Sequence, residues 1–346
     1  MARIKVKNIY YMLSYAFRAL SEEKYQDIAA EEFEYAADLL AAILAKGISS
    51  QIKRGLGRDY IVHSESLSLP RGKIDIAASI KEHGIISHKL VCAYDSYEEN
   101  TYLNQILKST IFYLMKSEEV KVERKKILKK LMLHFAGVDL VALTHVHWKA
   151  IRYSKNNETY KMLISICYLA AEGFVLSDEK GNMRMSKYID DRKMCYLYEK
   201  FLLAYYKKHY PEFNPRSSWI EWDEGNGFFE LLPVMKSDIT LEYRGKITII
   251  DAKFYSKMFQ YNPMHHSKTL RSENLYQIFT YVKNRDINND GSVSGVLLYA
   301  KTEDEENLDK TYILNKSQIS VKSLDLNQDF GTIRSSLNTI AENMMM

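Results

Sequence analysis

Proline, glycine and cysteine are all scarce in this sequence. Its 346 residues include only 5 Pro, 14 Gly and 3 Cys, which excludes collagen-like, low-complexity and disulfide-framed architectures. The cysteines, Cys92, Cys167 and Cys195, are far apart and form no CxxC pair, so we expect buried thiols in a reducing, cytoplasmic compartment. No apolar run reaches the roughly 18–20 residues of a membrane span, and we expect no membrane partner.

A strong excess of either charge is also missing. The 48 Lys and Arg against 44 Asp and Glu leave a formal charge of +4, which neither requires nor excludes a nucleic-acid partner. The 46% hydrophobic and 27% charged residues are typical of a folded globular protein, and the length predicts two domains. The phosphate-binding motif GxxxxGK[ST] is absent too, so the sequence shows no P-loop nucleotide site of its own.

The spacing of apolar residues predicts an N-terminal half that contains both helices and strands. This half ends at a polar stretch, residues 152–160. We therefore place the domain boundary there, with domains of 1–155 and 156–346. The expected helices cover 7–20, 29–46, 99–116 and 121–133, and the expected strands lie in a hairpin over 59–80, at 89–94 and in segments around 138–148.

The C-terminal half reads as an α/β domain. From residue 190 onward the expected order is helix, two strands, helix, strand, which predicts a mixed sheet covered by helices. The elements are helices over 160–173, 190–209 and 272–284, a hairpin over 238–255, a basic loop around 264–272 and a strand over 294–302.

Two charged residues end a strand that is otherwise apolar. Asp251 and Lys253 are two residues apart and therefore share a face. An RGK turn lets 238–243 pair with 247–252, which brings Asp238 close to Asp251. Adjoining carboxylates repel unless a proton or cation lies between them, and Mg²⁺ suits because it needs only one or two protein carboxylates plus a phosphate. Lys253 would orient or deprotonate the attacking water and offset phosphate charge.

A third acid, Glu199, lies on the helix expected at 190–209. Its neighbours one turn away are Cys195, Tyr196, Leu202 and Leu203. A carboxylate among such neighbours is costly unless it is paired or binds something. The alternative is an ordinary surface acid.

The spacing of these residues resembles the PD-(D/E)xK nuclease superfamily. Asp238 is followed after twelve residues by Asp251-Ala252-Lys253, with Glu199 before them and Tyr276-Gln277 after them. Ser237 stands where the motif name has proline. The resemblance implies an α-β-β-β-α-β core with metal ligands on its second and third strands.

Longer segments, in this order, resemble McrC, the nuclease-subunit family of McrBC modification-dependent restriction systems. They are "KNIYYMLSYAF", "LPRGKIDIAASI", "CAYDSYEENTYLNQILKSTIFYL", "LLPVMKSDITL", "IIDAKFY" and "NLYQIFTYV". The resemblance implies a mixed α/β N-terminal domain that docks on a hexameric McrB-like AAA+ GTPase and stimulates it. A PD-(D/E)xK endonuclease domain then cuts double-stranded DNA that contains modified cytosine.

The resemblance also implies roles for individual residues. Asp238, Asp251 and Lys253 would be catalytic, with Glu199 and Gln277 in support. The cofactor would be Mg²⁺, with Mn²⁺ as a substitute, and its ligands would be Asp238, Asp251, the backbone carbonyl of Ala252 and Glu199.

Basic residues near the expected site suggest contacts with the DNA backbone. In "HHSKTLR" we expect Lys268 and Arg271 to meet phosphates, which position DNA without reading its sequence. The adjacent His265-His266 rarely form a chelating pair. His145 and His147 share a face if that segment is a strand, but lack further ligands at zinc spacing.

The same residues also allow simpler interpretations. Asp238 and Asp251 could be turn and strand-end acids with Lys253 as an ion-pair partner, and Gln277 could lie at a helix edge. The chain could also be a non-cleaving adaptor that activates a GTPase ring, or a stand-alone repair-type nuclease.

Overall fold

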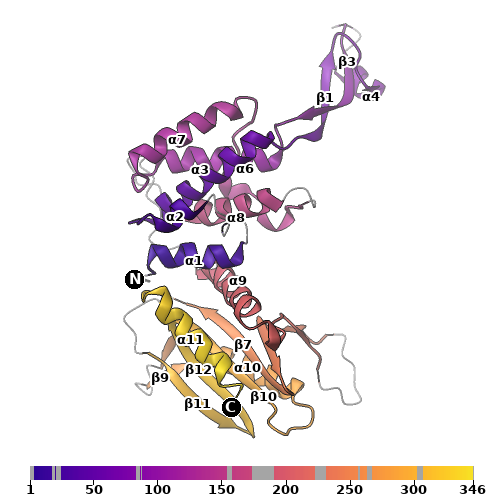
Figure 1. Cartoon of the computed structure of the whole chain (residues 1–346). Helices are drawn as coiled ribbons and strands as arrows, with labels where there is room; N and C mark the ends of the chain where they lie inside the picture. Colours follow the sequence, from indigo (N-terminus) through magenta and orange to yellow (C-terminus); the bar gives the residue numbers. More distant parts are fainter. Residues whose placement is uncertain are drawn as a thin grey trace. The chain divides into compact units, whose positions relative to one another are not determined.

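The computed structural model describes two compact units (Figure 1). Unit 1 comprises residues 1–39 and 186–346, and unit 2 comprises residues 40–185. Both combine helices and strands, which confirms the α/β prediction. No helix in the described ranges is long and apolar enough to cross a bilayer. These ranges are 4–17, 20, 25–82, 86, 88–153, 158–173, 191–222, 231–255, 258–262, 267–301 and 307–345.

A five-stranded mixed sheet forms the middle of unit 1, with the strand order β11-β12-β10-β7-β6. Strand β10 runs parallel to both β7 and β12, whereas β6 and β11 are antiparallel at the two edges. Strands β7 and β10 are largely buried because both of their faces are covered. The strands are β6 Ile239–Tyr243, β7 Lys246–Phe254, β10 Val293–Lys301, β11 Asp309–Leu314 and β12 Ser317–Asp325.

Helices cover both faces of this sheet. On one face, Ile278 and Val282 of α10 join Ile249 of β7 in a buried core. A Cβ added at Gly295 of β10 would lie 2.7 Å from Cγ1 of Ile278, so glycine allows this close approach of helix and sheet. On the other face, α9 packs against β7. The helices are α1 Val6–Ala16, α9 Asp191–His209, α10 Ser272–Arg285 and α11 Phe330–Glu342.

The first helix, α1, belongs to unit 1 although unit 2 follows it in the chain. The side-chain amide of Asn8 donates a 2.8 Å hydrogen bond to the carbonyl of Leu326. The ring of Tyr11 stacks on that of Phe330 at 4.4 Å. The N-terminal segment is therefore held by the end of β12 and the start of α11.

The expected domain boundary at residue 155 differs from this division of the chain. Residues 1–39 lie with the C-terminal sheet, and residues 156–185 lie in unit 2. The last residues of the polar stretch 152–160 begin helix α8, Glu158–Gly173, which packs against α6.

Unit 2 is built around helices with a buried polar network. The hydroxyl of Tyr160 donates to Oδ1 of Asn104 at 2.6 Å and accepts from the amide of Gly57 at 2.7 Å. Asn104 in turn donates to the carbonyls of Gly57 and Glu99. The helices predicted at 99–116, 121–133 and 160–173 are confirmed. The helices are α3 Ala36–Arg54, which starts at the border of the units, α6 Tyr102–Lys116, α7 Val122–Met132 and α8.

A small sheet in unit 2 carries few buried residues, and we call it the arm (residues 59–82 and 88–98). Strand β1 pairs antiparallel with β3 along its whole length, and β2 adds two residues to the other side of β3. The predicted hairpin over 59–80 is therefore wrong, because β3 lies between β1 and β2 and the segment after β2 is helical. The elements are β1 Asp59–Leu67, β2 Lys73–Ile74, α4 Ile76–Lys81 and β3 Leu90–Glu98.

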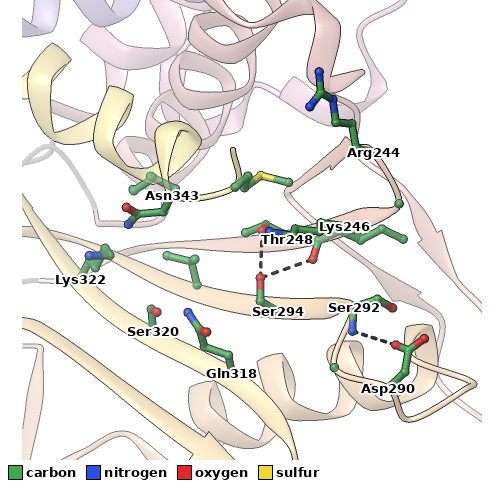
Figure 2. A pocket seen from close by; sticks show the side chains of 16 residues that line it. Arg244, Lys246, Thr248, Asp290, Ser292, Ser294, Gln318, Ser320, Lys322 and Asn343 are labelled. Atoms are coloured by element: carbon green, nitrogen blue, oxygen red, sulfur yellow. Dashed lines mark hydrogen bonds between the residues drawn. The ribbon is translucent and has the colours of Figure 1, made fainter. Parts of the chain in front are cut away.

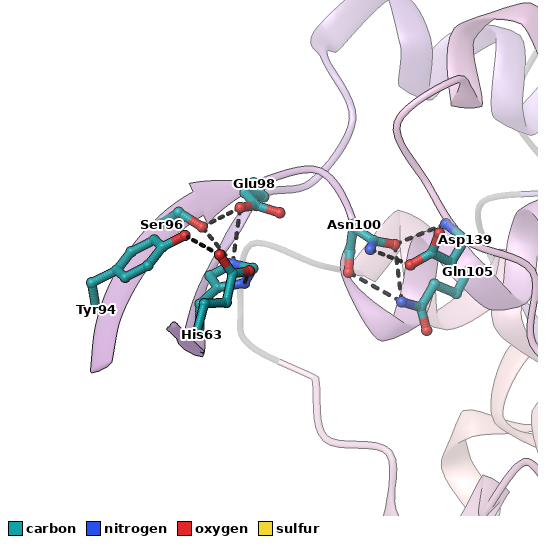
Figure 3. Close-up of polar contacts among 8 residues, drawn as sticks. His63, Tyr94, Ser96, Glu98, Asn100, Gln105 and Asp139 are labelled. Atoms are coloured by element: carbon teal, nitrogen blue, oxygen red, sulfur yellow. Dashed lines mark hydrogen bonds and ion pairs between the residues drawn. The ribbon is translucent and has the colours of Figure 1, made fainter. Parts of the chain in front are cut away.

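Polar side chains tie the arm together and fix its base (Figure 3). Between the two strands, Nε2 of His63 lies 3.0 Å from Oε1 of Glu98 and 2.7 Å from the hydroxyl of Ser96. At the base, Asn100 donates to Oδ2 of Asp139 at 2.7 Å. These contacts order an element that has little apolar core of its own.

The segments expected as strands around 138–148 are instead 3-10 turns, so that prediction is wrong. Leu143 and Val146 are buried three residues apart, which matches the 3-10 period rather than strand alternation. His145 and His147 therefore share no strand face. The turns are η3 Leu133–Phe135, η4 Leu143–His145 and η5 Trp148–Ala150.

The expected basic loop around 264–272 is partly a strand. Residues 267–270 form β9, which pairs antiparallel with β8, and His265-His266 lie outside the described residues. The remaining elements are α2 Gln26–Ala30, η7 Pro211–Phe213, β4 Trp219–Ile220, β5 Met235–Lys236, β8 Phe259–Asn262 and β9 Ser267–Leu270.

Candidate active site

The β6–β7 hairpin places the charged residues predicted from the sequence. Its two-residue turn has positive φ at Arg244 and Gly245, 49° and 82°, as turns of this length require. The register pairs Ile239 with Ile250, so Asp238 precedes β6 directly opposite Asp251. The predicted proximity of the two acids is confirmed.

Asp238 is anchored to the backbone of the neighbouring strand. Its Oδ2 accepts a 2.8 Å hydrogen bond from the amide of Ala252. Burial raises the pKa of Asp238 to about 7, and the nearby carboxylates of Asp251 and Glu199 add to the rise. The site therefore concentrates negative charge that only a proton or a cation can relieve.

Asp251 and Lys253 share one face of β7, as expected, and form an ion pair. Oδ2 of Asp251 lies 2.8 Å from Nζ of Lys253, and the side chains are only 2% and 12% exposed. Burial raises the pKa of Asp251 although Lys253 opposes the rise. Burial alone would lower the pKa of Lys253, but the charge and hydrogen bond of Asp251 outweigh it and raise that pKa. Lys253 is thus an ammonium group at neutral pH, suited to orienting a water molecule rather than deprotonating it.

Glu199 reaches this cluster from helix α9. The thiol of Cys195, one turn earlier, donates to Oε1 of Glu199 at 3.1 Å. Burial raises the pKa of Glu199. The positive charge of Lys253 lowers this pKa, and the negative charge of Asp251 raises it. Glu199 is therefore partly buried and within electrostatic range of the site, and its role in metal binding stays a prediction.

Gln277 of α10 also contacts the site. Its Oε1 accepts a 2.9 Å hydrogen bond from Nζ of Lys253, and its amide group donates to the hydroxyl of Tyr281 at 2.9 Å. Gln277 therefore does not lie at an isolated helix edge. Sequence reasoning missed Tyr281 as a partner of Gln277. It placed Cys195 beside Glu199 but missed the hydrogen bond between them, although each partner is four residues from a predicted site residue on the same helix face.

Ser237 takes the place of the motif proline with its own set of hydrogen bonds. The backbone amide of Ser237 donates to the carbonyl of Ser218 at 2.9 Å. Its hydroxyl accepts from the amide of Ser218 at 3.0 Å and contacts the hydroxyl of Thr240 at 2.8 Å. A proline lacks both the N–H and the hydroxyl, so serine fixes the start of β6 here in another way.

The residues present fit a divalent cation with few protein ligands. Apart from its ion pair with Lys253, the buried Oδ2 of Asp251 has no hydrogen-bond donor among the described residues. No three described His, Cys, Asp or Glu side chains converge closely enough to enclose a metal by themselves. The fit therefore rests on Asp238, Asp251 and backbone oxygen, as suits an ion such as Mg²⁺ that keeps several waters.

The two cations expected to meet DNA each lie against an aromatic ring. Nζ of Lys268 lies 4.3 Å from the ring centre of Phe259, and the guanidinium of Arg271 lies 4.6 Å from that of Tyr255. Arg271 also approaches Glu273 at 3.8 Å. Their contact with phosphates stays a prediction.

A cavity of about 600 Å³ lies beside β7 and β10, and Figure 2 shows the side chains that line it. Thr248 lines it and lies three residues before Asp251 on β7, so the cavity is on the opposite face of the sheet. Thr248, Ser294 and Ser320 line it together with the end of α11. The hydroxyls of Thr248 and Ser294 satisfy each other at 2.9 Å. None of the predicted site residues lines this cavity, so it is separate from the carboxylate cluster.

A mixed sheet with helices on both faces, and with two acids and a lysine at its β6–β7 hairpin, defines an α/β fold class. A family model described as "McrBC 5-methylcytosine restriction system component" matches residues 3–300. The chain belongs to this family.

Individual relatives agree with the family match. The Escherichia coli (strain K12) protein described as "Type IV methyl-directed restriction enzyme EcoKMcrBC" is 29% identical over 338 residues, 96% of each chain. Two solved assemblies from Thermococcus gammatolerans are also similar, each 17% identical to this chain. One, McrB AAA+ hexamers with bound McrC, has a TM-score of 0.47 over 97% of this chain and 76% of that chain. The other, an McrBC complex, has a TM-score of 0.40 over 57% and 56%.

Proposed function

We propose that this chain is the DNA-cleaving subunit of an McrBC-type restriction complex, a Mg²⁺-dependent endodeoxyribonuclease. The observation that carries the proposal is the cluster of Asp238, Asp251 and Lys253 within a buried hairpin. An ordinary ion pair needs one acid, whereas here a second carboxylate with a raised pKa lies beside the first. Family membership supports the same substrate class, double-stranded DNA with modified cytosine.

Asp238, Asp251 and the carbonyl of Ala252 would hold the ion, Mg²⁺ or Mn²⁺ in its place, with Glu199 as a further carboxylate beside them. Bound there, the ion supplies an acidified water and offsets charge on the scissile phosphate. The amide of Ala252 keeps Asp238 in place. The carboxylates also disfavour the approach of DNA unless cation charge is present.

Lys253 supplies a fixed positive charge next to the two acids. Because Asp251 keeps it protonated, its ammonium group orients the attacking water and stabilises charge that develops on the phosphate. Gln277 holds this group through its 2.9 Å contact with Nζ. Lys268 and Arg271 would position the DNA backbone next to the site.

We further propose that unit 2 docks on a hexameric McrB-like AAA+ GTPase and stimulates it. The arm exposes apolar side chains on β1 and β3: Tyr60 is 70% exposed, Val62 73% and Tyr97 58%. Exposed apolar groups of this kind are typical of a protein interface. The sequence itself has no GxxxxGK[ST] motif, so a partner would provide the nucleotide-driven step.

The test is cleavage of DNA that contains 5-methylcytosine by the chain together with an McrB-like partner, GTP and Mg²⁺. Asp251→Ala and the isosteric Asp251→Asn should abolish cleavage while circular dichroism and partner assembly stay unchanged. Asp309→Asn removes an exposed acid of the same sheet and should cut normally. Cleavage by either Asp251 variant would refute the assignment, and GTPase stimulation without any cleavage by the wild type would identify a non-cleaving adaptor.

A further inference from the structure

Cys195 connects two of the groups that surround the proposed ion. Its Sγ lies 3.1 Å from Oε1 of Glu199 and 4.0 Å from the carbonyl oxygen of Ala252. We propose that Cys195 is a positioning residue that holds the Glu199 carboxylate beside Asp238 and Asp251 for metal binding. This inference rests on the proposed metal-dependent function.

A thiol suits this task because it orients a carboxylate without neutralising it. Half-buried Glu199 forms no ion pair with any described residue, and the thiol of Cys195 is the donor that contacts it. Lysine or arginine in that place would cancel the negative charge and compete with a divalent cation. A neutral donor on Oε1 keeps the charge and leaves Oε2 for the ion or its water.

The surroundings of the other two cysteines differ. Cys92 and Cys167 are fully buried, and the thiol of Cys92 donates to the carbonyl of Leu90 at 3.4 Å. Cys195 is the partly exposed one of the three. Its position four residues before Glu199 places both side chains on one face of α9, toward the end of β7. Packing alone therefore accounts for Cys92 and Cys167 but not for the contacts of Cys195.

The experiment is a double-mutant cycle on Mn²⁺ affinity, measured with the full chain by electron paramagnetic resonance. Cys195→Ala should weaken Mn²⁺ binding about 10-fold, as removal of an outer partner of a metal ligand does. Cys195→Ser keeps a donor and should retain most of the affinity. In a Glu199→Gln background, Cys195→Ala should add no further loss, because its effect passes through Glu199.

Cys167→Ala is the matched control and should leave Mn²⁺ affinity unchanged. Cys195→Val, a non-donor of similar size, replaces alanine if the smaller side chain lowers the melting temperature. Unchanged affinity of the non-donor variants, or an equal loss with and without Glu199, overturns the positioning role while cleavage by the wild type still supports the proposed function. A wild-type chain that binds no Mn²⁺ overturns both.

Discussion

The backbone amide of Ala252 donates a 2.8 Å hydrogen bond to Oδ2 of Asp238, 14 residues earlier in the chain. This single contact fixes one acid of the site to the strand that carries the other, Asp251. It depends only on the register of the β6–β7 hairpin. The two carboxylates are thus held together even without a bound ion, and their mutual repulsion lowers the stability of the folded chain.

That repulsion predicts how stability depends on pH. The pKa of Asp238 rises from 3.8 to about 7 on folding, so the folded chain retains a proton that the unfolded chain releases. The resulting stability is fully present below pH 3.8 and is lost as the pH rises to about 7. Asp238→Asn removes the titrating carboxyl group, so the variant does not lose this stability as the pH rises. Without divalent metal we expect the variant to gain up to about 4 kcal/mol over the wild type between about pH 4 and pH 8.

Urea unfolding in the presence of a chelator measures this difference across the pH range. Asp309→Asn, on an exposed acid of β11, should show no comparable change. A gap between Asp238→Asn and the wild type that does not vary with pH would contradict the repulsion. Added Mg²⁺ should stabilise the wild type at neutral pH more than the variant.

Gln277 should affect the rate of cleavage rather than metal binding. Its Oε1 accepts from the ammonium of Lys253, and a hydrogen bond to a charged group contributes about 1.5–3 kcal/mol. Gln277→Ala should therefore lower the cleavage rate about 10-fold or more, with Mn²⁺ affinity unchanged. Tyr281→Phe removes only the outer link to Gln277 and should have a smaller effect. Wild-type rates in Gln277→Ala would show that Lys253 needs no such support.

The exposed face of the arm should determine partner binding. Replacing both Tyr60 and Val62 by serine removes apolar area that is 70% and 73% exposed, so folding should be unaffected. We expect the affinity for an McrB-like GTPase, measured by co-sedimentation, to fall about 10-fold or more, as for aromatic interface anchors. Leu133→Ser changes an equally exposed residue of unit 2 outside the arm and serves as the control. Equal binding by the arm variant and the control would exclude this docking surface.

Contacts of Lys268 and Arg271 with DNA phosphates should show in the salt dependence of DNA binding. Each phosphate contact contributes about 0.9 to the slope of log affinity against log salt concentration. Lys268→Ala and Arg271→Ala should each lower the slope by about that amount, for every DNA sequence alike. Lys246→Ala removes an exposed cation of the β6–β7 turn at the other end of the strand and should leave the slope unchanged. If all three variants give the same slope, Lys268 and Arg271 do not contact DNA phosphates.

The hairpin and its charges could be predicted because their signals are local. Strand alternation, the Arg244-Gly245 turn and the spacing of Asp238 to Asp251 together define one register. The order helix, strand, strand, helix, strand was likewise predicted from apolar periods. Helical spacing also indicated Glu199, whose four-residue separation from Cys195 brings the two into contact.

Other parts depend on interactions that the local pattern does not contain. Residues 74–80 alternate like a strand, yet Asp75 caps helix α4 by accepting a 2.9 Å hydrogen bond from the amide of Ala78. Strand β12 lies beyond the last predicted element, although Ile319 and Val321 alternate with polar residues as in a strand. The contact of Asn8 with Leu326 spans 318 residues, and no short-range signal could indicate it.

The chain leaves unit 1, which contains the five-stranded sheet, after residue 39 and returns to it at residue 186. A C-terminal fragment that starts near the middle of the sequence would consequently lack helix α1, which contacts Leu326 and Phe330. A smaller protein that keeps the five-stranded sheet together with helix α1 would therefore join residues 1–39 directly to residues 186–346.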